Sequence, residues 1–269
     1  MTGGRLIGSL GLLAACSCGQ IPKDGAQVPG QTRGDTALVR EVATPAEGMQ
    51  ADGVYFKAAG TEPFWGLEIG PASIRLMTLG DTLTTPHAEP VQAADANVKR
   101  YDLATEASIL QIEIAQGDCT NDMSGEKSPY SVRIAYRRTA VPELMEVEGC
   151  GRYVPDYRLH DIWVLESIRG TAVSATEYPA DLPTLEIRAG EQTYSGTTGC
   201  NRMMGSFFWE PGTLRFGPAA VTRMACPGMG NREQEFLSAL AAGTTYTIGD
   251  NRLRLSNPDQ EVLVFRKID

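Results

Sequence analysis

The sequence predicts a mainly β protein with an α+β part: two small antiparallel-sheet, barrel-like domains in tandem, the second carrying one helix. Three observations lead to this fold class. Apolar and polar residues alternate with a period of two in many segments, as in half-buried antiparallel strands. One short stretch near residue 235 has helical spacing instead. A chain of 269 residues also fits two domains of the usual size, about 100 to 150 residues each.

The first half of the chain has the pattern of a meander. Apolar residues alternate with polar ones in three segments, at residues 65–69, 110–114 and 130–136. Breaks rich in Gly, Asp and Asn, at residues 79–81 and 117–125, separate these segments. Since short polar turns join antiparallel strands, we expect an antiparallel sheet here and not a parallel α/β sheet.

The second half combines short strands with one helix. Its expected strands carry apolar pairs at alternate positions, Leu185/Ile187, Leu214/Phe216, Tyr246/Ile248 and Leu253/Leu255. Asn231 stands at the expected helix N-cap, with Gln234 three residues on as a variant of the capping box, and Gly243 ends the helix. One apolar face, which should lie across the sheet, contains Phe236, Leu237 and Leu240.

The first residues have the pattern of an export signal. Arg5 precedes an apolar run at residues 6–15, which is shorter than the roughly twenty residues that span a bilayer. The run ends in Leu13-Ala-Ala-Cys16, which resembles the lipobox of bacterial lipoproteins. The resemblance implies cleavage before Cys16 and acylation of Cys16, as with palmitate. Ser17, in place of Asp, resembles the outer-membrane sorting signal.

Two alternatives to acylation of Cys16 remain open. The segment can be a plain secretory signal with an incidental cysteine, or Cys18 can be the acceptor, which puts Ala15 where the motif prefers a residue like leucine. The Pro- and Gly-rich residues that follow, up to residue 52, cannot bury enough apolar surface to order themselves. They indicate a tether with a root-mean-square span of about 30 Å and a full extension of about 100 Å.

The charge of the chain argues against a nucleic-acid partner. There are 24 Lys and Arg residues against 33 Asp and Glu residues, a formal net charge of -9. Nucleic-acid phosphates require a basic face, and no cluster of Lys and Arg provides one.

Chemistry-bearing residues form no recognisable catalytic motif. His87 and His160 are far apart in sequence and lack metal-ligand spacing. By residue type alone, Cys150 with His160 could be a nucleophile pair, and Glu62 with Asp122 a carboxylate dyad. Cysteines of exported proteins are more often disulfides, and both carboxylates lie in sequences typical of solvated loops. We therefore expect no catalytic residue, no metal and no cofactor.

Residues 195–207 and 221–227 are the most distinctive part of the sequence. Three glycines surround Cys200-Asn201-Arg202, so the backbone must turn tightly or let another segment approach closely, as in an arch between two strands. Arg223 and Cys226 follow, and we expect Cys226 to pair with Cys200.

Gly-Cys-Asn-Arg-x-x-Gly-Ser-Phe at residues 199–207, then Thr-Arg-Met-Ala-Cys at 222–226 and an acidic helix, resemble the META-domain family of HslJ-like heat-shock proteins. The resemblance covers the chain from residue 158 onward, with an opening strand at Trp163 and a closing strand at 262–265. It implies a stress-related role but no defined reaction.

A second resemblance covers residues 53–157. Gly60-Thr-Glu-Pro-Phe-Trp65, Cys119-Thr-Asn-Asp-Met-Ser-Gly125 and Gly149-Cys-Gly151 resemble an uncharacterised family of envelope lipoproteins. It implies that Cys119 pairs with Cys150; pairing across the two domains is the alternative. The expected organisation is a signal peptide at 1–15, a lipidated tether at 16–52, an N-terminal β domain at 53–157 and a META/HslJ-like domain at 158–269.

Residues that could recognise a partner lie around the arch. If Cys200 pairs with Cys226, Asn201, Arg202 and Arg223 become neighbours. Either Asn201 closes the turn while the arginines meet acidic or carbonyl groups, or the three form a surface for an anionic or carbonyl-bearing partner.

Aromatic pairs are a further possible recognition site. Trp65 follows Phe64, and Trp209 closes the run 207–209. Adjacent residues of a strand point to opposite faces, so at most one of each pair can be exposed. Such clusters are more often core.

Together these features predict a non-enzymatic lipoprotein of the bacterial cell envelope, a binding or protective module linked to stress. We expect it to be lipid-anchored in the outer membrane and to face the periplasm, with the membrane and an unknown envelope protein or ligand as partners. The alternatives are an inhibitor of the lysozyme type or a carrier of a small apolar ligand. An enzyme is the least favoured reading.

Overall fold

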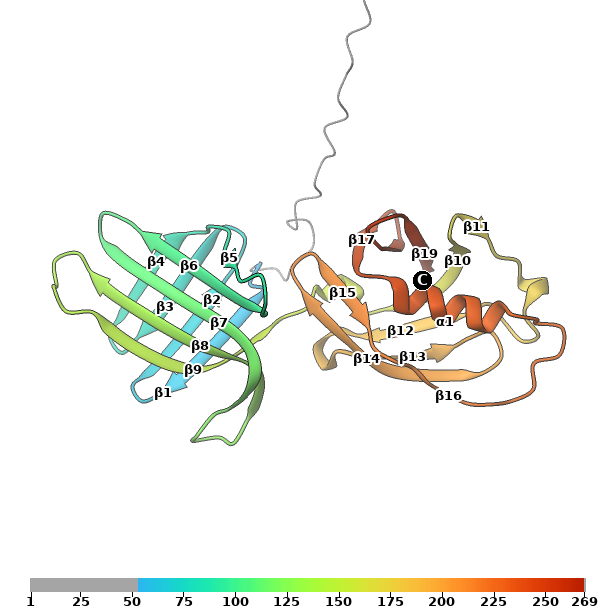
Figure 1. Ribbon diagram of the computed structural model, residues 1–269, viewed down its shortest axis with the longest axis horizontal. Coiled ribbons are helices and arrows are strands. Elements are labelled where there is room, and N and C mark those ends of the chain that lie inside the picture. Colours follow the sequence, from blue (N-terminus) through green and yellow to red (C-terminus); the bar gives the residue numbers. More distant parts are fainter. Residues whose placement is uncertain (1–52, 269) are drawn as a thin grey trace, which may run out of the picture. The chain divides into compact units, whose positions relative to one another are not determined.

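The computed structural model describes residues 53–268. The expected signal peptide, the lipobox with Cys16, and the tether lie outside the described residues. Two antiparallel sheets make up the described part, one a half-barrel and the other nearly closed into a barrel, so the predicted mainly β fold is confirmed (Figure 1).

The first sheet has the strand order β4-β3-β2-β1-β9-β8-β7-β6-β5. Its strands are β1 (Phe56–Thr61), β2 (Phe64–Ile69), β3 (Ser73–Thr78), β4 (Asp81–Pro86), β5 (Val91–Gln92), β6 (Val98–Ala104), β7 (Ser108–Thr120), β8 (Lys127–Arg138) and β9 (Met145–Tyr153). Nearly all neighbours in the sheet are also neighbours in sequence, as the predicted meander requires; the exception is β1, which pairs with β9.

The second sheet has the order β15-β14-β13-β12-β10-β19-β18-β17, with β11 on β10 and β16 on β14. Its strands are β10 (Ile162–Ile168), β11 (Thr171–Ala172), β12 (Thr184–Arg188), β13 (Thr193–Thr197), β14 (Arg202–Glu210), β15 (Thr213–Phe216), β16 (Ala220–Val221), β17 (Thr245–Gly249), β18 (Arg252–Ser256) and β19 (Glu261–Lys267). The short 3-10 helices are η1 (Tyr157–Leu159), η2 (Ala175–Glu177) and η3 (Ala189–Glu191).

Helix α1 (Arg232–Ala242) contacts β10, β15 and β19, as its apolar face predicts. Phe236 and Leu240 are buried. The helix starts after Asn231 and ends at Gly243, but the expected capping box is wrong, because the Asn231 side chain makes no capping hydrogen bond. Asn231 has φ -94° and ψ 8°, outside the extended region from which an N-cap side chain reaches the N–H groups of the first turn.

The long hairpin of β7 and β8 differs from expectation. Residues 117–125 were expected to be a break, yet pairing continues beyond a bulge between Gln116 and Cys119, as far as Thr120 opposite Lys127. The Cys119–Cys150 disulfide joins this extension to β9.

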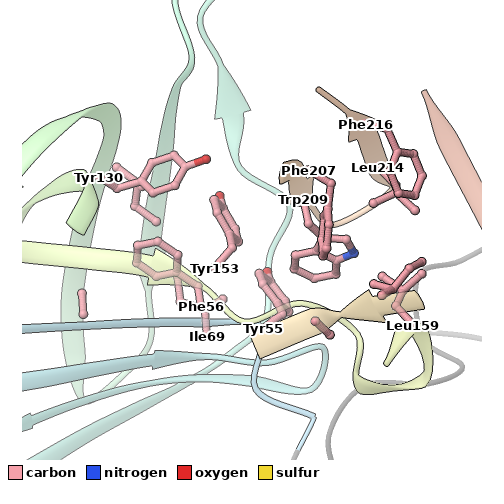
Figure 2. Packing of buried hydrophobic residues seen from close by; sticks show 14 of the residues in the cluster. Tyr55, Phe56, Ile69, Tyr130, Tyr153, Leu159, Phe207, Trp209, Leu214 and Phe216 are labelled. Atoms are coloured by element: carbon pink, nitrogen blue, oxygen red, sulfur yellow. The ribbon is translucent and has the colours of Figure 1, made fainter. Parts of the chain in front are cut away.

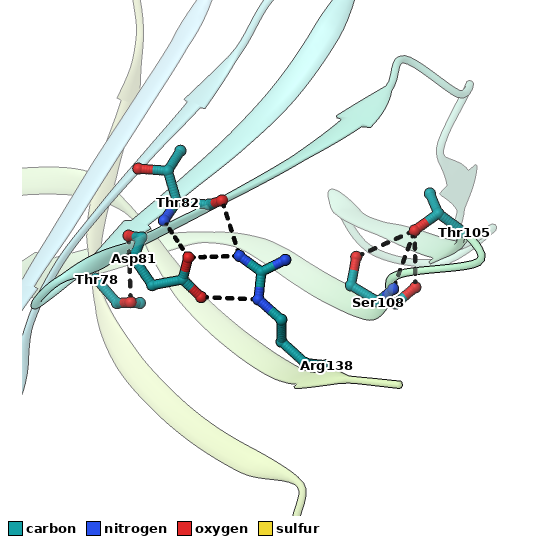
Figure 3. Close-up of polar contacts among 6 residues, drawn as sticks. All are labelled: Thr78, Asp81, Thr82, Thr105, Ser108 and Arg138. Atoms are coloured by element: carbon teal, nitrogen blue, oxygen red, sulfur yellow. Dashed lines mark hydrogen bonds and ion pairs between the residues drawn. The ribbon is translucent and has the colours of Figure 1, made fainter. Parts of the chain in front are cut away.

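The first sheet also has an ion pair between the end of β8 and the start of β4. Arg138, at the end of β8, binds the carboxylate of Asp81, the first residue of β4, with two guanidinium nitrogens, one of them Nε at 2.9 Å (Figure 3). The Thr82 N–H donates to the same carboxylate at 2.8 Å, and the guanidinium donates to the Thr82 carbonyl. This exposed ion pair therefore links β8 with β4, two strands that are far apart in sheet order.

Buried side chains of both sheets belong to one hydrophobic cluster. Figure 2 shows part of it, where the Tyr153 and Trp209 rings lie with centroids 6.4 Å apart. Next to Trp209, Glu210 is only 7% exposed, and its carboxylate is paired. It accepts hydrogen bonds from Tyr130 Oη at 2.6 Å, Asn97 Nδ2 at 2.8 Å and Lys99 Nζ at 2.6 Å. A buried carboxylate is tolerated when paired in this way.

Candidate functional site

The arch is a tight turn between β13 and β14, as the glycines predicted. Thr198 closes it twice, because its N–H donates to the Asn201 carbonyl at 2.8 Å and its Oγ1 accepts from the Asn201 N–H at 3.0 Å. Gly199 has φ +91°, a conformation that favours glycine. At Gly196 a Cβ would lie 2.0 Å from the Thr184 carbonyl oxygen, so glycine lets β12 approach closely.

Both predicted disulfides are present. Cys200 is bonded to Cys226 with Cα atoms 6.1 Å apart, and Cys119 to Cys150 with Cα atoms 5.5 Å apart. Each bridge lies within one sheet region, so pairing across the two halves is excluded. Because Cys150 is bonded to Cys119, it is not a free thiol that could act with His160.

Asn201 is the centre of the arch. It is 2% exposed, and its side chain contacts the segment that leads to Cys226. Oδ1 accepts from the Met224 N–H at 2.7 Å and from Thr222 Oγ1 at 2.9 Å, while Nδ2 donates to the Met224 carbonyl at 3.4 Å. Asn201 therefore fixes the backbone of this segment, and of the two roles considered for it these contacts favour the structural one.

The helix is tied to the same turn through Glu233. Its carboxylate accepts from Thr198 Oγ1 at 2.5 Å and from Asn201 Nδ2 at 3.0 Å. Thr198, Thr222 and Glu233 were not identified as site residues from the sequence. The family motif was the available signal for two of them, since Thr222 precedes Arg223 in it and Glu233 lies in the first turn of the acidic helix.

Arg202, which follows Asn201, and Arg223, which precedes Met224, are both exposed. Neither guanidinium has a hydrogen-bond or ion-pair partner within residues 53–268, so the acidic or carbonyl groups expected to meet them are not found there. Two methionines are exposed beside them, Met204 at 62% and Met224 at 59%. We call Arg202, Met204, Arg223 and Met224 the arginine–methionine surface.

Trp65 does not fit the recognition role considered for it. Its ring is 4% exposed, and its Nε1 donates to the Glu148 carbonyl at 3.2 Å. The neighbouring Phe64 is 54% exposed, because adjacent residues of a strand point to opposite faces. Trp209 is likewise buried, at 3% exposure. Trp65 and Trp209 are core residues.

Glu62 and Asp122 both line a groove of about 850 Å³ on the first sheet. Three more carboxylates line it, those of Glu113, Glu146 and Glu148. The groove is thus strongly polar and does not suit an apolar ligand.

Among the described residues, no group of three or more His, Cys, Asp or Glu side chains is placed to hold a metal ion. His87 lies in the first sheet region, where its Nε2 is 2.8 Å from Tyr55 Oη. In the same part of the chain, no helix has the length and apolar character needed to cross a membrane.

The second sheet, its single α-helix and the bridged arch define a small disulfide-bonded antiparallel β domain. Residues 158–269 match the META domain family. No protein with a curated description matches the chain.

Two solved structures are similar to part of it. One, described as the NMR structure of a protein from Burkholderia xenovorans, is 31% identical, with 41% of this chain and 85% of that chain covered and a TM-score of 0.34. The other, also an NMR structure, is 28% identical over 40% of this chain and 90% of that chain, with a TM-score of 0.32.

Proposed function

We propose that the protein is a non-enzymatic lipoprotein of the bacterial cell envelope, anchored in the outer membrane through Cys16, whose META domain binds a partner during stress protection. The observation that carries the binding function is the arginine–methionine surface. Arg202 and Arg223 are exposed and have no partner within residues 53–268, and the backbone beside them is fixed by the Asn201 side chain and the Cys200–Cys226 disulfide. Such preorganisation lowers the entropic cost of binding.

The family match supports the stress-related part of this proposal, because residues 158–269 match the META domain. The lipobox-like sequence before Cys16 supports the anchor, and the two disulfides suit an oxidising compartment such as the periplasm.

The anchor and the binding function need separate experiments. Incorporation of radiolabelled palmitate, together with accumulation of the labelled, uncleaved precursor in the presence of globomycin, tests the anchor, with Cys16→Ser as the unlabelled control; an unlabelled wild-type chain would refute it. Crosslinking in intact envelopes followed by purification of the full chain tests binding. We expect defined crosslinked species that increase under envelope stress, and the absence of any such species would contradict the binding function.

A further inference from the structure

The arginine–methionine surface shows what kind of partner the META domain suits; this inference rests on the binding function proposed above. Arg202 and Met204 lie on the outward face of β14, since Met203 between them is 2% exposed. Opposite them, Met204 pairs with Ala220, and the Thr222 N–H donates to the Arg202 carbonyl at 3.0 Å. The Thr222–Met224 segment therefore runs directly beside Arg202.

Among the residues that the structure describes, no carboxylate pairs with the two arginines of this surface. Several ion pairs elsewhere join neighbouring strands, as between Arg254 on β18 and Glu261 on β19, with Nη1 and Oε2 3.0 Å apart. The carboxylate close to the arch, Glu233, instead binds Thr198 and Asn201. In a chain of net charge -9, two neighbouring arginines without carboxylate partners within residues 53–268 form a local basic site.

The geometry points to an acidic protein segment that also carries apolar side chains, and we infer that such a segment is the partner. The planar guanidinium binds carboxylates with two parallel hydrogen bonds, which gives direction as well as charge. Exposed methionines adapt to apolar side chains of different shapes. A bilayer is a poorer fit, because attraction to anionic lipid takes clusters of about four to eight basic residues.

A binding experiment with defined peptides tests this inference. The full chain, purified in detergent, is titrated with a short peptide of alternating glutamate and leucine, and with glutamate–serine and lysine–leucine peptides of equal length. We expect the glutamate–leucine peptide to bind most tightly. The Arg202→Ala/Arg223→Ala variant should weaken its binding at least about tenfold, the change expected when charged contacts at the centre of an interface are lost.

Matched variants separate the surface from general charge effects. Arg215 on β15 is also exposed and lacks a partner among the described residues, so Arg215→Ala should leave the affinity unchanged. Met204→Ser/Met224→Ser should weaken binding of the glutamate–leucine peptide, so that its affinity approaches that of the glutamate–serine peptide. All these side chains are exposed, and unchanged melting temperatures would show that the variants fold.

Three results would overturn the inference. The first is that the double arginine variant binds the glutamate–leucine peptide as tightly as the wild-type chain does, and the second is that Arg215→Ala weakens this binding as much as the double variant does. The third is arginine-dependent binding to phosphatidylglycerol vesicles without peptide binding, which would assign the surface to lipid. If envelope crosslinks persist in the double arginine variant, the proposed binding function stands and this inference alone fails. If neither crosslinks nor peptide binding is seen, both fail.

Discussion

Asn201 contacts both backbone polar groups of Met224, accepting from its N–H at 2.7 Å and donating to its carbonyl at 3.4 Å. The side-chain amide thus takes the place of a neighbouring strand for a segment that has left the sheet. Because the amide is 2% exposed, water cannot replace these hydrogen bonds easily.

Asn201→Ala is expected to destabilise the protein by about 2 to 3 kcal/mol, since it leaves the Met224 N–H and Thr222 Oγ1 without a buried acceptor. Urea denaturation measures the change. The matched control is Asn257→Ala, whose Oδ1 accepts from the N–H groups of Asp259 and Gln260 in an exposed turn and should cost less than about 1 kcal/mol. An equal loss in the free energy of unfolding for the two variants would contradict the role of Asn201 in fixing the Thr222–Met224 segment.

The Cys200–Cys226 bridge closes a loop with a sequence separation of 26 residues. In the chain-entropy model, Cys200→Ser/Cys226→Ser should therefore lower the free energy of unfolding by about 3 to 4 kcal/mol. Peptide mapping without reductant checks the connectivity. A peptide that joins Cys119 to Cys226 would show that the connectivity is wrong.

Glu210→Ala should be among the most damaging single changes, at about 3 to 5 kcal/mol, because it leaves the Lys99 ammonium without its counter-charge. The Lys99 side chain is 12% exposed. The control is Glu148→Ala, whose pair with Arg133 has side chains 69% and 70% exposed, and which should cost no more than about 1 kcal/mol. Thermal unfolding followed by circular dichroism compares them, and similar losses would argue against a buried pair.

Hydrogen bonding from Arg138 lowers the pKa of Asp81 below its ordinary value of 3.8. Because the pKa of Asp81 is lower in the folded state than in the unfolded state, its ionised carboxylate stabilises the fold at a pH above the unfolded-state pKa. This stabilisation is lost as the pH falls through the folded-state pKa. Arg138→Gln should raise the pKa of Asp81 toward its ordinary value, as measured by NMR titration of the carboxyl carbon. Arg137→Gln should leave it unchanged, and a titration of Asp81 insensitive to Arg138 would rule out the ion pair in solution.

Much of the fold could be predicted because its signals are local. Alternation of side chains reports directly on a strand with one buried face, so the apolar runs at 65–69, 110–114 and 130–136 became β2, β7 and β8. The Cys200–Cys226 disulfide was likewise within reach, because these cysteines stand beside turn-forming glycine and proline, whereas Cys119–Cys150 was expected from a family resemblance. The bulged extension of β7 escaped prediction, since its Gly and Asp residues look like a turn and a disulfide to a third strand holds them in the sheet.

The sequence by itself determined most of the strand pattern and the α-helix near residue 235, and it left pairing of the cysteines across the two domains open. Only the tertiary structure decided which polar residues are buried and what they contact. Asn201 and Arg202 are neighbours in sequence, yet one is buried and the other exposed, because β14 begins there and turns alternate side chains to opposite faces. Glu210 meets Lys99 across 111 residues of chain, and Trp65 lies inside while Phe64 lies outside. Such contacts depend on the packing of elements distant in sequence, and no local pattern contains that information.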